Sequence, residues 1–192
     1  MSETSLRPRE RYCLFETGLG TCGIAWSEAG VVRLQLPERT RERTAGRIRL
    51  GDRQEADVPP RAIGELIGQL VAYFAGQQVG LSGVAVDLSR VPAFHRSIYR
   101  ALRKVGWGET ATYGELARRA GAPGAARAVG QAMGRNPVPI IIPCHRVLAA
   151  GGRIGGFSAY GGALTKERLL ALEGVHPSGT PPLPGLLHRA AR

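Results

Sequence analysis

Cysteine is scarce in this sequence. The chain of 192 residues has three cysteines, Cys13, Cys22 and Cys144, which form neither a CxxC pair nor a metal-ligand spacing. Their odd number leaves at least one thiol free and excludes a fully paired disulfide framework. We therefore expect a reducing, cytoplasmic setting, no metal and no other cofactor, with Cys13 and Cys22 packed in a core.

Long hydrophobic runs are also lacking. No stretch approaches the ~18 consecutive apolar residues that a membrane-spanning helix needs. The opening "MSETSLRPRERY" is polar and has none of the apolar core of a signal peptide. These absences predict an untargeted protein without membrane contact.

Acidic residues are scarce in the second half. Residues 93–192 carry 14 Lys and Arg against 4 Asp and Glu, a net charge of +10, whereas residues 1–92 carry 12 against 11, a net charge of +1. Within the second half, residues 93–135 alone have 8 basic and 2 acidic side chains. Such a concentration of positive charge favours a polyphosphate partner, and nucleic acid in particular.

The first half begins with the pattern of a β-hairpin. Residues 22–28 ("CGIAWSE") and 31–37 ("VVRLQLP") alternate apolar and polar side chains as half-buried strands do, and residues 28–30 predict the turn between them. The segment from Thr40 to Asp57 is charged and lacks periodicity, so we expect a loop there.

A helix and a further strand complete the first half. After Pro60, apolar residues recur at the spacing of one helical face as far as Phe74, and the helix should end near Gly76. The stretch "VAVDL" at 84–88 resembles another strand. No catalytic constellation occurs in this half, which favours a scaffold role.

A helix with one strongly basic side is predicted after Pro92, which suits the first turn of a helix. Its apolar face would consist of Phe94, Ile98, Leu102 and Val105. Its opposite side would carry His95, Arg96, Arg100, Arg103 and Lys104.

Two shorter helices should follow. In "ATYGELARRAG", Thr112 and Glu115 have the spacing of a capping box, and Gly121 should end the helix that they begin. A short "APGA" link leads to a second helix over residues 125–133. Two short helices joined by a tight turn in a basic region predict a helix-turn-helix.

The second of these helices, "AARAVGQAMG", is slim. Only Arg127 and Gln131 are long and polar enough to probe base edges. Its alanines and glycines allow two interpretations: tight packing against a neighbouring helix, or insertion into the narrow minor groove with Arg127 replacing an extruded base.

In the stretch "IIIPCHRV", residues 140–147, an apolar run that favours a strand is followed by a proline and then by Cys144, His145 and Arg146. A buried cysteine at a strand end has a purely structural interpretation, because free cysteine is among the most buried residue types. The alternative is a nucleophile. A thiol with a pKa of about 8.5 is mostly protonated at neutral pH, so it requires a neighbouring base, which His145 can supply.

Taken together, "TYGELA", "RAVGQAMGRNPVPIIIPCHRVLAAGG" and "KERLLALEG" closely resemble the O6-alkylguanine-DNA alkyltransferases, also called methylated-DNA–protein-cysteine methyltransferases. The match runs from about Phe94 to Gly174. It implies an α/β (α+β) protein with a small ribonuclease-H-like α/β domain at 1–91. A mainly helical, winged-helix-like DNA-binding domain would follow at 92–175, and a flexible extension at 176–192.

The resemblance also implies a mechanism. Cys144 would take the alkyl group from O6-alkylguanine, and from O4-alkylthymine, in a single turnover. His145 would relay a proton from the thiol through a water molecule, and Glu173 would orient His145. Asn136 would hold the turn before the cysteine.

Further site residues follow from the same resemblance. The target base would be extruded from double-stranded DNA by a monomeric, nucleoid-associated protein. The DNA-binding residues would be Tyr113, Ala126, Arg127, Gln131 and Arg135. The pocket would be formed by Tyr113 and Val147 together with the glycine-rich segment 155–162, in which Ser158 and Tyr160 are the candidate contacts.

Three rival interpretations remain open. A lesion binder without transfer would lack the cysteine of PCHRV, which is present here. A thiol hydrolase built on Cys144, His145 and Glu173 would need an oxyanion hole and would have no use for the Arg127 helix. A plain architectural DNA-binding protein would leave the reactive centre unexplained.

Overall fold

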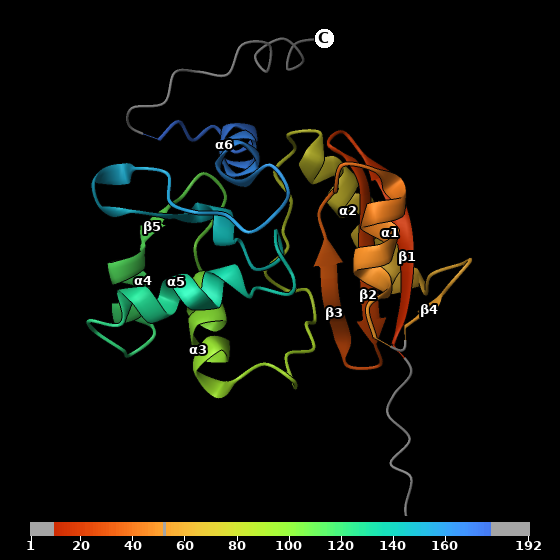
Figure 1. Ribbon diagram of the computed structural model, residues 1–192, viewed down its shortest axis with the longest axis horizontal. Coiled ribbons are helices and arrows are strands. Elements are labelled where there is room, and N and C mark those ends of the chain that lie inside the picture. Colours follow the sequence, from red (N-terminus) through yellow and green to blue (C-terminus); the bar gives the residue numbers. More distant parts are fainter. Residues whose placement is uncertain (1–9, 52, 178–192) are drawn as a thin grey trace, which may run out of the picture.

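The computed structural model describes residues 10–51 and 53–177, which form two parts lying side by side (Figure 1). The first part is built on a sheet with the strand order β3-β2-β1-β4. The strands are β1 (Arg11–Thr17), β2 (Gly20–Ser27), β3 (Gly30–Gln35) and β4 (Gln54–Glu55). The hairpin predicted over residues 22–37 is confirmed, because β2 and β3 pair antiparallel.

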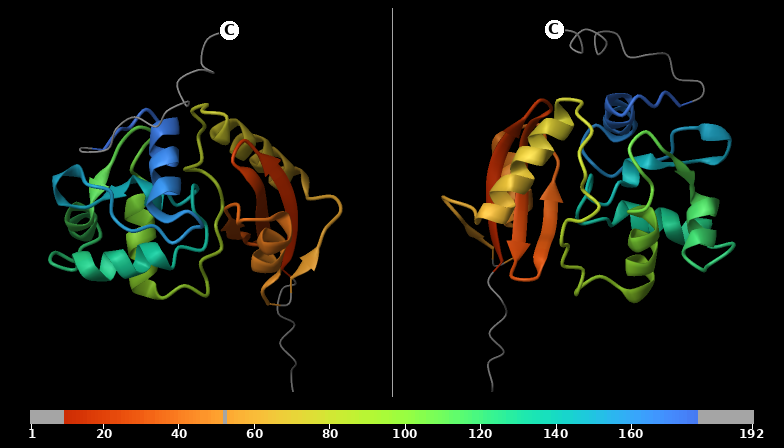
Figure 2. Two further views of the ribbon diagram at one scale, coloured as in Figure 1. Left: turned by 45° about the horizontal axis from the view of Figure 1, so that its top comes forward. Right: turned by 180° about the vertical axis from the view of Figure 1, so that it is seen from behind.

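Two helices cover opposite faces of this sheet, α1 (Arg41–Arg49) and α2 (Arg61–Phe74) (Figure 2). The period of two along β1 explains how: Tyr12 packs with Ile48 of α1, whereas Cys13 and Phe15 belong to the large core that includes the apolar side of α2. A Cβ on Gly23 would lie 3.0 Å from the side chain of Ile48, so the glycine allows α1 to approach the sheet closely.

The prediction of a loop from Thr40 to Asp57 was wrong. The chain forms α1 there, with the Thr40 hydroxyl accepting from Arg43 N at the helix start. Only Thr44 and Ile48 of this helix are buried, so its sequence has too few apolar positions to show a helical period. The strand expected at 84–88 is reduced to a single bridge between Val86 and Val31.

The second part is mainly helical. Its helices are α3 (Ala93–Leu102), α4 (Tyr113–Arg119), α5 (Ala126–Gly134) and α6 (Gly162–Leu172). Short parallel strands β5 (Ala111–Thr112) and β6 (Val147–Leu148) tie α4 to the segment after Cys144. The predicted capping box is confirmed, since Thr112 and Glu115 bond reciprocally at the start of α4.

The helix predicted after Pro92 is confirmed, but part of its expected apolar face was wrong. Phe94 is 38 % exposed, and Val105 is buried three residues beyond the end of α3. Arg103 does not extend the basic side into solvent. It donates to Ser82 O and Val84 O, both at 2.6 Å, and so fixes the segment that connects the two parts.

The prediction of a strand at Ile140–Ile142 was also wrong. These residues form a turn in which Ile140 has a φ of 71° and Ile142 N donates to Val138 O. A β-branched residue rarely adopts this left-handed conformation, so surrounding contacts must impose it. The isoleucines are nevertheless buried, as the apolar run predicts.

The two parts meet along β3, where Leu34 N donates to Pro137 O at 3.0 Å. The end of α2 also reaches the second part, where the ring of Tyr73 packs against Trp107. Within residues 10–51 and 53–177, no helix is long and apolar enough to cross a membrane.

Candidate active site

Cys144 begins a single turn of 3-10 helix, Cys144–Arg146, directly after the Ile140 turn. The side chain of Asn136, just beyond α5, braces that turn on both sides. Its Nδ2 donates to Ile142 O at 2.7 Å, and its Oδ1 accepts from Val138 N at 3.0 Å. The backbone that presents the thiol is therefore held from the end of α5.

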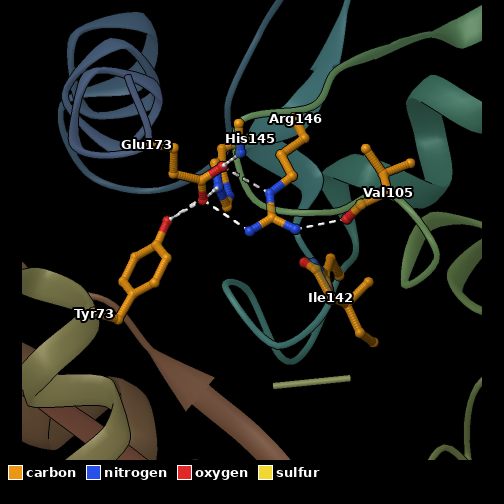
Figure 3. Close-up of polar contacts among 8 residues, drawn as sticks. Tyr73, Val105, Ile142, His145, Arg146 and Glu173 are labelled. Carbon is orange, nitrogen blue, oxygen red and sulfur yellow. Dashed lines mark hydrogen bonds and ion pairs between the residues drawn. The ribbon is translucent and has the colours of Figure 1, made fainter. Parts of the chain in front are cut away.

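His145 and Glu173 form a buried pair next to this turn (Figure 3). His145 Nε2 lies 2.8 Å from Glu173 Oε1, and neither side chain has any exposed area. Arg146 donates through Nε to Glu173 Oε2 at 2.8 Å and through Nη2 to Oε1 at 3.0 Å. The other ring nitrogen of His145, Nδ1, is buried and has no hydrogen-bond partner among the described residues.

Hydrogen bonding favours an ionised Glu173 in this cluster, and burial favours a neutral His145. Burial by itself would raise the pKa of Glu173, but hydrogen bonds from His145 and Arg146 outweigh it and bring that pKa to about 2. Burial lowers the pKa of His145, although Glu173 opposes the shift. His145 is thus a neutral base at physiological pH, oriented by a carboxylate.

The Cys144 thiol is protonated at rest. Burial raises its pKa, and the opposing influences are a hydrogen bond with Asn136 and the positive charge of Lys166. Since the thiolate is the reactive form, a proton must leave Cys144 before it can attack. A neutral imidazole adjacent in the chain is suited to accept that proton.

Lys166 on α6 is completely buried, which is unusual for lysine. Its Nζ donates to Val147 O, in the strand that follows the cysteine turn. Burial lowers the pKa of Lys166 to about 8, and the nearby Cys144 opposes this shift. A positive charge is therefore held close to the nucleophile.

A cavity of 290 Å³ lies beside Cys144, between the two parts of the chain. Its wall includes three residues of the predicted site, Asn136, Arg135 and Ser158. The first part also contributes, through Arg33, Gln35, Glu38 and Arg47.

The other predicted pocket residues do not line this cavity. Tyr113 is half-buried and packs against Gly155, where an added Cβ would lie 2.9 Å from its hydroxyl oxygen. Val147 is completely buried, and Tyr160 is 52 % exposed. Ser158 therefore lines the same cavity as Cys144, whereas Val147 and Tyr160 do not.

An exposed polar stripe runs along α5. Arg127, Gln131 and Arg135 are four residues apart and all exposed, while Ala126 beside them is partly buried. The opposite side of the helix is buried through Val129, Ala132 and Met133. Tight packing therefore occupies only one face of this slim helix, and the face with Arg127 is free to meet a partner outside the described chain.

More basic side chains are exposed on the neighbouring helices and at their ends. Arg118 and Arg119 end α4, and Arg100 and Lys104 lie at the end of α3. Because Arg103 is engaged with backbone carbonyls, the basic surface is smaller than the sequence predicts.

Cys13 and Cys22 lie in the core of the sheet. Burial raises the pKa of Cys22 to about 12, so this thiol remains protonated. Among the described residues, no group of three or more His, Cys, Asp or Glu side chains is arranged to hold a metal ion.

The sequence reasoning missed three residues of this centre, Tyr73, Arg146 and Lys166. Arg146 lies inside the quoted PCHRV motif, and only its contact with Glu173 shows its role. Lys166 occurs in a helix where lysine is ordinarily exposed. Tyr73 has no local signal, because its partners lie 72 and 100 residues further along the chain.

Comparison with known proteins places these features in a family. The family described as "6-O-methylguanine DNA methyltransferase, DNA binding domain" matches residues 93–175. A Mycobacterium bovis protein named methylated-DNA–protein-cysteine methyltransferase is 39 % identical over 163 residues, covering 84 % of this chain and 91 % of its own length. A Mus musculus protein of the same name is 35 % identical over 202 residues, covering 97 % and 90 %.

Solved structures agree with these sequence matches. The crystal structure of Mycobacterium tuberculosis OGT in complex with DNA is 36 % identical, with a TM-score of 0.69, and covers 85 % of this chain and 92 % of that one. The O6-methylguanine-DNA methyltransferase of Pyrococcus kodakaraensis is 29 % identical, with a TM-score of 0.59 over 86 % of this chain and 99 % of that one. The mixed α/β fold, the arrangement around Cys144 and relatives matched over most of the chain lead to one conclusion: this chain belongs to the family of methylated-DNA–protein-cysteine methyltransferases.

Proposed function

We propose that this protein repairs DNA by transferring the alkyl group of O6-alkylguanine, and of O4-alkylthymine, to Cys144. Relatives named for this activity, and one bound to DNA, support the proposal. The observation that carries it is the pairing of a braced, buried thiol with the adjacent His145–Glu173 dyad. No other cysteine in the described chain has a histidine beside it.

The transfer requires one proton movement and one exchange of bonds. His145 Nδ1 accepts the proton of Cys144, directly or through one water molecule, and Glu173 stabilises the resulting imidazolium. The thiolate attacks the alkyl carbon, a carbon–sulfur bond forms, and the bond from that carbon to O6 breaks. The electron pair remains on the guanine, which gains a proton to become normal guanine.

The product on the protein is a thioether. Because a thioether offers water no good leaving group, Cys144 is not regenerated and each molecule acts once. The protein is therefore both the transferase and the acceptor.

The target base must leave the duplex before it can reach Cys144, since a buried thiol cannot approach a stacked base. The exposed stripe of α5 supports docking in the minor groove, with Arg127 filling the vacated stack and Ala126, Gln131 and Arg135 beside the DNA. Tyr113 would crowd the target phosphate. Ser158 would contact the base in the cavity beside Cys144.

The proposal also includes the domain organisation and the place of action. The chain divides into a ribonuclease-H-like domain at 1–91 and a winged-helix-like domain at 92–175, and it acts as a monomer on nucleoid DNA in the cytoplasm. The flexible extension expected at 176–192 lies almost entirely outside the described residues.

The backbone around Cys144 argues against a thiol hydrolase. Cys144 N donates to Ile142 O at 2.8 Å and Arg146 N to Pro143 O at 2.9 Å, so two nearby N–H groups are engaged within the turn. An oxyanion hole needs such groups to point at the substrate. Peptide mapping after exposure to O6-methylguanine duplex tests the proposal, because only alkyl transfer leaves a stable methyl group on Cys144.

Binding to undamaged duplex should depend strongly on salt and weakly on sequence. If about four exposed arginines and lysines neutralise phosphates, affinity should fall roughly 100-fold between 50 and 200 mM salt. Fluorescence anisotropy titrations at several salt concentrations measure the slope of log affinity against log salt concentration.

Arg118→Gln should reduce the magnitude of this slope by about one. Arg43→Gln, a matched change on exposed α1, should leave it unchanged. A salt-independent affinity would refute the electrostatic part of the proposal.

Lys166→Met should slow transfer from free O6-benzylguanine about tenfold near pH 7, because losing the buried cation raises the pKa of Cys144 further. Lys166 itself has a pKa of about 8, so it is charged below that pH and neutral above it. The difference between the two proteins should therefore narrow well above pH 8. Transfer rates across this range, with exposed Lys104→Met as the control, measure the effect. An equal ratio at every pH would assign Lys166 a packing role alone.

A further inference from the structure

One side chain from the first part of the protein reaches the reactive centre of the second. Tyr73 lies near the end of α2 and is 1 % exposed. Its hydroxyl donates to Glu173 Oε1 at 2.7 Å, and its oxygen lies 3.1 Å from His145 Nε2 (Figure 3). Tyr73 therefore touches both members of the dyad.

The direction of these hydrogen bonds follows from the number of protons. Glu173 is ionised, so it can only accept, and the single hydroxyl proton of Tyr73 is directed to it. Toward His145 the tyrosine oxygen can then only accept. Both Tyr73 and Glu173 thus require a proton on Nε2, which leaves Nδ1 with the free electron pair.

The surroundings keep Tyr73 in this role. Its ring makes edge contacts with Phe74 and Trp107, at centroid distances of 5.3 and 5.4 Å, from the first and second parts of the chain respectively. Burial raises the pKa of Tyr73 well above its usual value, and the charge of Glu173 raises it further. The hydroxyl therefore remains a donor throughout the physiological range.

We propose that Tyr73 is a positioning residue of the proton relay, which fixes His145 as the Nε2–H tautomer so that Nδ1 is the base for Cys144. This inference rests on the proposed alkyl transfer. It also changes the role of the first part, which the sequence indicated to be a scaffold. The reactive centre is shared between both parts, and α2 contributes to chemistry that occurs on the other.

Tyr73→Phe removes one oxygen atom and keeps the ring. Transfer near pH 7 should slow about tenfold, as expected for a misplaced base. The loss should be equal on duplex DNA and on free O6-benzylguanine, because base extrusion is unaffected. Glu173, relieved of its shortest donor, should bind the imidazolium of His145 more strongly. This gain should outweigh the loss of the neutral tyrosine acceptor at 3.1 Å, because a charged acceptor forms the stronger hydrogen bond. The pKa of His145 should therefore rise, and the fall in transfer rate on the acid side of the pH–rate profile should begin at a higher pH.

The pKa of His145, and with it the acid side of the pH–rate profile, depends on all the groups that face the ring. They are Tyr73 from α2, Glu173 after α6, Lys166 on α6, and Arg146 and Cys144 from the turn itself. Of these groups, only Tyr73 is changed in Tyr73→Phe. A purely structural role for Tyr73 would lower the rate without moving the acid side of the profile, so the pH profile separates the two.

Tyr12→Phe provides the matched control. Tyr12 is also 1 % exposed, and its hydroxyl donates to a carboxylate, Glu55 Oε2 at 2.9 Å, within the sheet of the first part. This variant should keep the rate and the pH profile of the natural protein. If the natural protein fails to transfer at all, the proposed function fails. If it transfers and Tyr73→Phe matches it, only the inference about Tyr73 fails.

A second measurement is independent of the stability of any variant. Nitrogen-15 NMR of the imidazole in the natural protein reports which ring nitrogen of His145 carries the proton. A protonated Nε2 and an unprotonated Nδ1 would support the proposal. The opposite tautomer would overturn it, because Tyr73 could not then accept from His145.

Discussion

Cys144→Ser protein mixed with an excess of O6-methylguanine duplex should keep its mass, whereas the natural chain should gain one methyl group and no more. Serine occupies nearly the same space, so the Asn136 brace and the His145–Glu173 dyad remain in place. Its hydroxyl is a far weaker nucleophile near neutral pH, and transfer should fall at least about a thousandfold. Intact-protein mass spectrometry over time measures the change.

Binding should survive this substitution. The side chains proposed to grip the duplex lie on α4, on α5 and just beyond α5, and none of them depends on the sulfur atom. The Cys144→Ser protein should therefore bind lesion-containing duplex and protect it from repair by the natural protein. A gel-shift titration beside the mass measurement separates lost chemistry from lost folding.

Cys13→Ser is the matched control, because Cys13 is also buried but lies in the sheet core with no histidine beside it. This variant should still gain one methyl group. Methyl found chiefly on Cys13 or Cys22, or repeated turnover by one molecule, would contradict the mechanism and favour a hydrolase or a lesion binder.

Local signals in the sequence account for the elements that were predicted correctly. The Thr112–Glu115 capping box needs only four adjacent residues, and it starts α4 as expected. The helix ending at Phe74 shows a clear apolar period, and five residues of the helix are buried. By contrast, α1 buries only Thr44 and Ile48, so nothing in its period distinguishes it from a charged loop.

Specific side-chain contacts explain what the apolar pattern of the sequence could not predict. Three isoleucines favour a strand, yet Asn136 bonds to Ile142 O and holds the segment as a turn with Ile140 in a left-handed conformation. Tyr73 joins the centre only because the end of α2 packs beside Trp107. The turn depends on a side chain six residues before Ile142, and the place of Tyr73 depends on partners 72 and 100 residues away, so an apolar pattern alone predicts neither feature.

Arg127→Ala should impair repair of duplex DNA far more than reaction with free O6-benzylguanine. Arg127 is exposed on the free face of α5, and the described residues provide no acidic partner within ion-pair distance. In the duplex, its side chain would occupy the space of the extruded base and offset the cost of unstacking, which is a few kcal/mol. Because each 1.4 kcal/mol is about a tenfold change, repair of duplex should slow roughly 100-fold.

Free O6-benzylguanine needs no extrusion, so its reaction with Arg127→Ala should stay within about twofold of the natural rate, as for most exposed substitutions. Gln131→Ala is the matched control, since Gln131 is exposed one turn further along the same stripe. Gln131→Ala should slow duplex repair far less, because the side chain of Gln131 is shorter than that of Arg127 and uncharged, and does not fill the vacated stack. Single-turnover rates on both substrates provide the comparison. Equal losses on both would show that Arg127 supports the fold or the thiol, and the base-extrusion mechanism would then need a different residue.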